Sequence, residues 1–202
     1  MQFSYIKRTL QFRFEAGTSR GVLKTRDVYW IKVVDQSFPE VEGWGEAAPL
    51  VKLSIDDRPD FEQVLSQILN RLGQQTWSRV NEEILNQVSD RIPSDFPSIR
   101  FGVETALLDL VNGGQKKIFT TPFVENERAI PINGLIWMGD RDFMFQQIEQ
   151  KLQEGFDCIK MKIGAIDFEQ ELSLLRYIRD RFSADQVTLR VDANGAFSPG
   201  EA

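Results

Sequence analysis

The regular alternation of strand and helix patterns from about Ala129 onward is the feature that most limits how this chain can fold. Apolar runs typical of strands and segments with helical periodicity follow each other in turn. The predicted elements are, in order, a strand over Pro131–Met138, a helix over Arg141–Glu154, a strand over Cys158–Ile163, a helix over Asp167–Phe182 and a strand over Val187–Val191. Strands separated by helices at this spacing pair in parallel through right-handed crossovers. The second part of the chain is therefore predicted to be the beginning of a β/α array.

The first part of the chain has another pattern, in which strands come before helices. Strands are predicted over Phe3–Glu15, Asp27–Val34 and Gly43–Ala48, with the turn-rich segment Gly17–Gly21 between the first two. Helices are predicted from a first turn at Pro59 to Leu72, over Glu82–Val88, and over Ser98–Val111 with Phe101, Ala106, Leu107 and Leu110 on its inner face.

These patterns predict an α+β domain over residues 1–127 and a β/α domain over residues 128–202, with the boundary between Phe119 and Arg128. Three parallel strands do not close a barrel, and a parallel sheet normally has both faces covered and its edges protected. We therefore expect the β/α domain to be incomplete in these 202 residues, or to be completed by another chain. The alternative is a complete small α/β layer of three strands.

The sequence contains no histidine. Within the chain, this excludes a Ser-His-Asp or Cys-His nucleophile and any histidine-ligated zinc site. Acid–base chemistry must then use Lys, Asp, Glu or Tyr. A bound metal would have oxygen ligands, which favour magnesium or a similar hard cation.

Charge and cysteine content narrow the possible partners and compartments. A net charge of −6 argues against a nucleic-acid partner, because phosphate binding requires a basic surface. The single cysteine, Cys158, cannot form an intramolecular disulfide and is expected to be a small buried hydrophobic residue. No segment is long and apolar enough to span a bilayer, and the N-terminus lacks the features of a signal peptide. We expect a cytoplasmic protein with no membrane partner. The sequence is compatible with a homo-oligomer.

Two lysines and an aspartate stand out in the β/α part. Lys160 and Lys162 are two residues apart on one predicted strand, so their side chains point to the same face. Asp192 comes one helix and one strand after Lys162, which places both at the carboxyl ends of adjacent parallel strands, where β/α enzymes carry catalytic residues. Arg190 has the same parity as Asp192, and Asn194 lies just beyond the strand. The alternatives are a solvent-facing lysine pair and ordinary turn chemistry in the Asp-Ala-Asn-Gly segment.

These residue types suit the removal of a proton from a carbon next to a carboxylate. A divalent cation held by Asp192 would stabilise the negative charge of the enolate, and a lysine would take the proton. A free lysine is protonated at neutral pH. A second ammonium group or a metal ion nearby favours the neutral amine that a base requires, which would explain Lys160 beside Lys162.

Five segments, in order along the chain, resemble the muconate-lactonizing subgroup of the enolase superfamily. They are GWGEAAPL at Gly43–Leu50, FGVETALLD at Phe101–Asp109, PINGL at Pro131–Leu135, KMK at Lys160–Lys162 and RVDANGAF at Arg190–Phe197. The resemblance covers essentially the whole chain. It implies an α+β capping domain followed by the first β/α units of a TIM-type barrel that is incomplete in this chain. It also implies two further carboxylate ligands and a second lysine on later strands, so we expect these residues alone to be inactive.

The resemblance implies a role for each matching residue. Lys162 would be the base that removes the proton, and Lys160 its charge-tuning neighbour. Asp192 would be the first ligand of Mg²⁺ (or Mn²⁺), and Asn194 would orient that ligand. The capping loops of the family cover a small carboxylate substrate. This implies substrate contacts at Thr18, Ser19, Arg20, Ala47, Ala48 and Pro49. The resemblance also implies substrate contacts at Asn133 and Arg190 in the β/α part.

Within the superfamily, the GTSRG loop at Gly17–Gly21 and the arginine two residues before Asp192 are more similar to o-succinylbenzoate synthases than to epimerases. Such a lyase dehydrates 2-succinyl-6-hydroxy-2,4-cyclohexadiene-1-carboxylate to o-succinylbenzoate through an enediolate, in menaquinone or phylloquinone biosynthesis. The alternative on the same scaffold is a dipeptide epimerase or N-acylamino acid racemase, which would use two opposed lysines. A third possibility is a β/α piece with a structural or oligomerising role.

Overall fold

The structure, a computed structural model, describes residues 1–18, 21–77 and 83–200, with the backbone alone for residues 14–18. The chain divides into two compact units. The first comprises Met1–Arg13 and Lys24–Arg128, and the second comprises Phe14–Leu23 and Ala129–Ala202. The predicted domain bounds of 1–127 and 128–202 did not separate Phe14–Leu23 from the rest of the first part.

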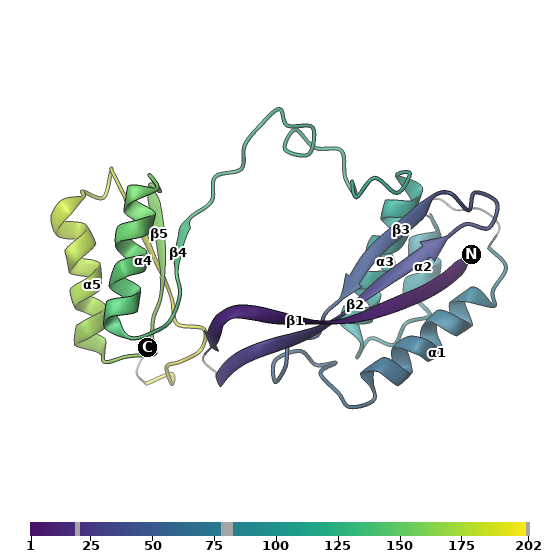
Figure 1. Cartoon of the computed structure of the whole chain (residues 1–202), viewed down its shortest axis with the longest axis horizontal. Coiled ribbons are helices and arrows are strands. Elements are labelled where there is room, and N and C mark those ends of the chain that lie inside the picture. The colour runs from purple at the N-terminus through teal and green to yellow at the C-terminus, as the bar shows by residue number, and fades with distance from the viewer. Residues whose placement is uncertain (19–20, 78–82, 201–202) are drawn as a thin grey trace. The chain divides into compact units, whose positions relative to one another are not determined.

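The first unit is built on a three-stranded sheet in the order β1-β2-β3 (Figure 1). Strand β1 is Gln2–Thr18, β2 is Gly21–Val34 and β3 is Glu42–Ala47. Strands β2 and β3 are antiparallel, with Tyr29 opposite Ala47. Tyr29, Ile31 and Val33 alternate along β2 and are all buried, as expected for a strand with one face against a core.

Three helices complete the first unit. Helix α1 is Phe61–Gly73, α2 is Glu83–Ser89 and α3 is Pro97–Val111. The rings of Phe61 and Tyr29 lie 5.0 Å apart, which joins α1 to the sheet. Buried residues at helical spacing on α1, among them Leu65 and Leu69, continue the same core.

Two predictions about these helices are wrong. Pro59 lies outside α1, whose N-cap residue is Asp60. Phe101 is 64% exposed and does not belong to the inner face of α3. It lies two residues from both Ile99 and Val103, which are fully buried, and residues two apart on a helix do not share a face.

Strand β3 and helix α3 approach each other closely because glycines line their contact. A Cβ atom on Gly45 would lie 2.0 Å from the carbonyl oxygen of Gly102. A Cβ atom on Gly43 would lie 2.1 Å from the carbonyl oxygen of Ala106. Any larger residue at these strand positions would push the strand away from the helix.

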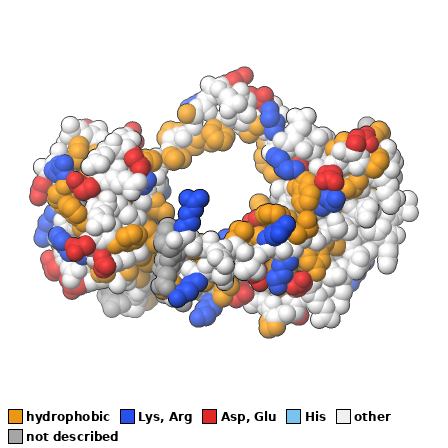
Figure 2. Space-filling model, viewed as in Figure 1, with side chains coloured by type: hydrophobic (Ala, Val, Ile, Leu, Met, Phe, Trp, Pro, Cys, Tyr) orange, Lys and Arg blue, Asp and Glu red, His pale blue; other side chains and the backbone are white. Residues whose placement is uncertain are grey.

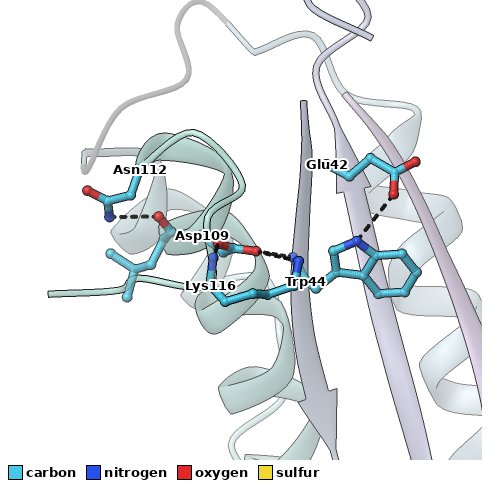
Figure 3. Close-up of polar contacts among 6 residues, drawn as sticks. Glu42, Trp44, Asp109, Asn112 and Lys116 are labelled. Carbon is cyan, nitrogen blue, oxygen red and sulfur yellow. Dashed lines mark hydrogen bonds and ion pairs between the residues drawn. The ribbon is translucent and has the colours of Figure 1, made fainter. Parts of the chain in front are cut away.

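A buried carboxylate also joins α3 to β3. Asp109 is 1% exposed and accepts hydrogen bonds from the backbone N–H groups of Trp44 at 2.9 Å and Lys116 at 2.6 Å (Figure 3). The Lys116 ammonium lies 3.3 Å from the same carboxylate. The ammonium groups of Lys32 and Lys116 lie 5.7 and 5.6 Å from the Trp44 ring. Asp109 thus connects the helix, the turn after it and the strand.

The second unit contains a parallel sheet in the order β4-β5-β6 (Figure 1). The strands are β4 (Gly134–Ile136), β5 (Cys158–Lys162) and β6 (Thr188–Asp192), and the helices are α4 (Arg141–Gln153) and α5 (Phe168–Arg181). The strand–helix alternation predicted from the sequence is present. Both helices lie on one face of the sheet, over a core that includes Ile136, Ile159, Met161, Ile148 and Ile178.

Four further observations concern the second unit and the chain as a whole. Strand β4 has three residues and is shorter than the predicted run over Pro131–Met138, in which Ile132 is 70% exposed. Cys158 is partly exposed, so the expectation of a buried thiol is wrong. Figure 2 shows acidic and basic side chains interspersed on the visible surface of this unit. Within the described ranges, no helix has the length and apolar character needed to cross a membrane.

Gly45→Ala is expected to lower the free energy of unfolding by about 3 kcal/mol, because the added methyl group overlaps the backbone of Gly102. Urea unfolding followed by tryptophan fluorescence measures this, since Trp30, Trp44 and Trp77 all belong to the first unit. Gly73→Ala is the matched control, because the nearest atom to its added Cβ is 4.0 Å away. An unfolding free energy that Gly45→Ala leaves unchanged would contradict the close approach.

Asp109→Ala is expected to cost about 2–4 kcal/mol of unfolding free energy, because it leaves two backbone N–H groups without their acceptor. The same urea experiment applies. The control is Glu125→Ala, which removes an exposed ion pair with Lys117 at 3.3 Å and should change stability by less than about 1 kcal/mol. Equal effects of the two substitutions would show that Asp109 has no special role.

Candidate active site

Strand β5 presents its two lysines on the face of the sheet opposite to the helices. Ile159 and Met161 are fully buried in the core beneath α4 and α5. Lys160 and Lys162 are partly accessible, with 26% and 16% of their side chains exposed. Because successive residues of a strand point to opposite faces, the two lysines share one face, as their spacing predicts.

Both lysines reach one aspartate on the neighbouring strand. The parallel register places Lys162 opposite Asp192 and Lys160 opposite Arg190. The Nζ atoms of Lys160 and Lys162 lie 2.7 and 2.9 Å from the same oxygen of Asp192, Oδ2. The structure thus brings together two positive charges and one negative charge at the carboxyl ends of β5 and β6.

The electrostatic environment of Asp192 favours its ionised form. Hydrogen bonds from Lys160, from Lys162 and from the backbone N–H of Asn194 hold the pKa of the Asp192 carboxyl well below its usual range. Asp192 is therefore a carboxylate at neutral pH, which is the form in which it could bind a hard cation.

Asn194 contacts both the predicted base and the predicted metal ligand. It lies in the turn after β6 with φ at 50°, a left-handed conformation that asparagine tolerates better than most residues. Its backbone N–H donates to Oδ1 of Asp192 at 3.0 Å, and its side-chain oxygen accepts from Nζ of Lys162. Gly195 follows with φ at 71°, so the turn uses two successive left-handed residues.

Two of the predicted substrate contacts are joined to each other. Nη1 of Arg190 donates to Oδ1 of Asn133 at 3.1 Å. Arg190 lies on β6 and Asn133 directly precedes β4, so this bond crosses the central strand β5. Both side chains are at least partly exposed.

The other predicted substrate contacts lie elsewhere in the chain. Ala47, at the end of β3 in the first unit, is fully buried, which leaves Ala48 and Pro49 as the accessible members of that stretch. The carbonyl oxygen of Ala48 accepts a hydrogen bond from Arg26. Thr18 is the last residue of β1, and Ser19 and Arg20 lie outside the described residues. The roles of these residues stay predictions.

The donor type at this site fits magnesium. Asp192 supplies a hard, ionised oxygen ligand at a strand end. In the part of the chain that the structure describes, no group of three or more His, Cys, Asp or Glu side chains lies close enough to hold a metal ion. Asp192 therefore stays the one predicted metal ligand among the described residues, and the family resemblance implies that the remaining ligands would come from later strands.

Glu171 is a residue near these strand ends that the sequence patterns did not predict. It is 2% exposed, and its carboxylate accepts from the backbone N–H groups of Gly164 and Ala165, in the loop directly after β5. A signal was available in the sequence. Glu171, Leu174 and Ile178 are three and four residues apart, so helical periodicity places an acidic residue on the buried face of α5.

Comparisons with known proteins agree with the geometry. Residues 144–202 match the family model for enolase C-terminal domain-like proteins. Over its whole length the chain is 39% identical to an o-succinylbenzoate synthase of Desulfotalea psychrophila, of which it covers 60%. The solved structure of MenC from the same organism is 34% identical, with a TM-score of 0.77 over 100% of this chain and 59% of that one.

More distant solved structures share the fold. An o-succinylbenzoate synthase of Thermosynechococcus elongatus, complexed with Mg in the active site, has a TM-score of 0.71 at 20% identity, over 100% of this chain and 54% of that one. A dipeptide epimerase of Enterococcus faecalis, complexed with Mg and a dipeptide, has a TM-score of 0.75 at 16% identity, over 99% of this chain and 55% of that one. The chain thus spans about 60% of the length of the curated relative from D. psychrophila. Residues 144–202 thus match the enolase C-terminal domain-like family, and the whole chain is similar to about 60% of an o-succinylbenzoate synthase.

Proposed function

We propose that the protein to which this chain belongs is an o-succinylbenzoate synthase, a carbon–oxygen lyase that requires Mg²⁺. It would dehydrate 2-succinyl-6-hydroxy-2,4-cyclohexadiene-1-carboxylate to o-succinylbenzoate, a precursor of menaquinone or phylloquinone. The observation that carries the proposal is the cluster in which Lys160 and Lys162 both contact Oδ2 of Asp192. The 39% identity to the D. psychrophila synthase supports this substrate over that of an epimerase.

In this proposal Lys162 removes the proton from the carbon next to the substrate carboxylate. It is the less exposed of the two lysines, and Lys160 brings a second positive charge to the same oxygen of Asp192. The proton passes to Nζ of Lys162, and the electron pair of the broken C–H bond enters an enediolate. Hydroxide then leaves the adjacent ring carbon, so the substrate loses the elements of water and its ring becomes aromatic.

Asp192 would be the first ligand of Mg²⁺, or of Mn²⁺ as another hard cation, together with two further carboxylates that the family resemblance implies. When bound, the ion supplies Lewis-acid stabilisation of the negative charge on the substrate carboxylate. The backbone N–H of Asn194, 3.0 Å from Oδ1, orients the Asp192 carboxylate. Since Oδ2 accepts from both lysines, the two ammonium groups and a cation compete for that oxygen.

The remaining parts of the chain would bind and cover the substrate. The guanidinium of Arg190, oriented by Asn133, suits a substrate carboxylate because its planar N–H groups can bind both carboxylate oxygens. Contacts from the capping loops would come from Thr18, Ser19, Arg20, Ala48 and Pro49, since Ala47 is buried in the core of the first unit. Residues 1–127 would then be the capping domain, and residues 128–202 the first β/α units of a (β/α) barrel.

Lys162→Ala in the complete protein is expected to lower kcat by roughly 100- to 10,000-fold, because the proton acceptor is lost. The assay follows the Mg²⁺-dependent loss of the cyclohexadiene absorbance. The matched control is Lys151→Ala, which removes a lysine that pairs with Glu154 at 2.6 Å on α4 and should leave kcat unchanged. Turnover of Lys162→Ala near the wild-type value would exclude Lys162 as the base.

The same assay, together with an assay of epimerisation, distinguishes the synthase from the alternative function, a dipeptide epimerase or N-acylamino acid racemase. Fast, Mg²⁺-dependent dehydration by the wild-type protein supports the synthase. Failure to dehydrate, with epimerisation of dipeptides or racemisation of N-acylamino acids instead, would keep the strand-end site and assign it to epimerase or racemase chemistry.

Asp192→Asn is expected to weaken Mg²⁺ binding by at least about tenfold, because the amide oxygen is a neutral and weaker ligand for a hard cation. Titration calorimetry of the complete protein with MgCl₂ measures this. Asp185→Asn, a change in the exposed segment between α5 and β6, is the charge-matched control and should leave the affinity unchanged. Equal affinities of the Asp192→Asn and wild-type proteins would exclude Asp192 as a ligand.

A further inference from the structure

Glu171 is one of the few fully buried charged residues of the described chain, and the mechanism above does not use it. It lies near the start of α5, and its Oε1 atom accepts from the N–H groups of Gly164 at 2.7 Å and Ala165 at 3.2 Å. The N–H of Ile166 is 3.5 Å from the same oxygen. A buried carboxylate is costly unless its oxygens are satisfied, and here the backbone of the β5–α5 loop satisfies Oε1.

The loop that Glu171 holds packs against the turn that carries Asn194. Gly164 has φ at 89°, and a Cβ atom on it would lie 2.4 Å from the Cβ atom of Ala196. The N–H of Ala196 donates to the carbonyl of Ala193 at 2.9 Å, so Ala196 is itself part of the turn after β6. A displacement of the β5–α5 loop would therefore be transmitted to this turn.

The same loop is also connected directly to strand β6, which ends at the predicted metal ligand Asp192. The N–H of Ile163, the residue after Lys162, donates to the backbone carbonyl of Asp192 at 3.0 Å. This bond continues the β5–β6 ladder by one step beyond the paired residues Lys162 and Asp192. Gly164, the first residue that Glu171 holds, follows Ile163 in the chain.

Helix α5 holds Glu171 in a fixed position. Leu174 and Ile178, on the same side of the helix, are fully buried in the core of the second unit. Asp167 caps the helix by accepting from the N–H of Glu169 at 3.0 Å. The position of the carboxylate is thus determined by the core and not by the exposed loop that it binds.

We propose that Glu171 is a positioning residue for the reaction: by holding the backbone of Gly164–Ile166 it keeps Lys162 and Asp192 in register. The inference rests on the proposed function of these two residues. Glu171 touches neither the substrate nor the metal in this scheme, and acts through the loop. A shift of reacting groups by about 1 Å can lower a rate by roughly 100-fold, so a support of this kind has a measurable effect.

The test compares three variants of the complete protein. Glu171→Ala removes the acceptor of the loop N–H groups and is expected to lower kcat by roughly 10- to 100-fold, with KM changed much less. Glu171→Gln keeps the Oε1 acceptor that receives these bonds and should recover most of the activity. Leu174→Ala makes a cavity in the same buried face of α5, and is the control for stability loss without loss of the loop contact. Thermal midpoints are measured for all three.

A larger fall in kcat for Glu171→Ala than for Leu174→Ala, at comparable thermal midpoints, with rescue by Glu171→Gln, supports positioning. Equal falls in kcat for Glu171→Ala and Leu174→Ala, or a kcat of Glu171→Ala near the wild-type value, would overturn it.

Residue-resolved amide hydrogen exchange gives a readout that does not depend on turnover. The N–H of Ile163 bonds to Asp192 and not to Glu171, so its exchange reports whether the effect reaches the site. Faster exchange at Ile163 in Glu171→Ala, but not in Leu174→Ala, supports the proposal even if the wild-type protein dehydrates no substrate and the proposed function fails. Unchanged protection of Ile163 in Glu171→Ala would show that Glu171 acts on its own loop only.

Discussion

The parallel pairing of β5 with β6 is the interaction on which the second unit depends. It sets Lys162 opposite Asp192 and, two residues earlier, Lys160 opposite Arg190. The same backbone turns Ile159 and Met161 into the core beneath the helices. A slip of one residue would turn the charged side chains to the apolar face and the apolar ones to the site, so the hydrophobic core itself keeps the register of the site. The partial exposure of both lysines limits the desolvation cost of placing two ammonium groups on one carboxylate.

Buried carboxylates that bind backbone N–H groups recur in both units. Asp56 is fully buried and accepts from the N–H of Ser98 at 2.7 Å, at the start of α3. Asp109 accepts from Trp44 and Lys116 near the end of the same helix, and Glu171 binds the loop before its own helix. In each case a charged oxygen replaces the water that a backbone N–H group would otherwise bind. The donors lie on the outer strand β3, in the first turn of α3 and in the loops after α3 and β5.

Much of the fold could be predicted from local patterns. Apolar periodicity places the helices α1, α3, α4 and α5 and the strands β5 and β6 within a few residues of their observed bounds, whereas β2 begins at Gly21 and not at the predicted Asp27. The prediction of Phe101 as an inner residue of α3 failed because glycine and alanine, not large apolar residues, form much of the contact with β3. Hydrophobicity identifies apolar residues, but a close contact between backbones selects small ones. The predicted length of β4 was too great, because an apolar run does not show how many of its residues form hydrogen bonds to a neighbouring strand.

The sequence by itself determined that Lys160 and Lys162 share a face and that Asp192 lies on the adjacent strand. These statements follow from the twofold repeat of a strand and from the parallel pairing that a β/α alternation requires. Only the tertiary structure decided that both lysines meet one oxygen of Asp192, that Asn194 contacts Lys162, and that Arg190 reaches across to Asn133. The buried contact of Glu171 with the loop after β5 belongs to the same class. Such contacts depend on loop conformations and on the distances between packed elements, and no periodicity along the chain encodes those.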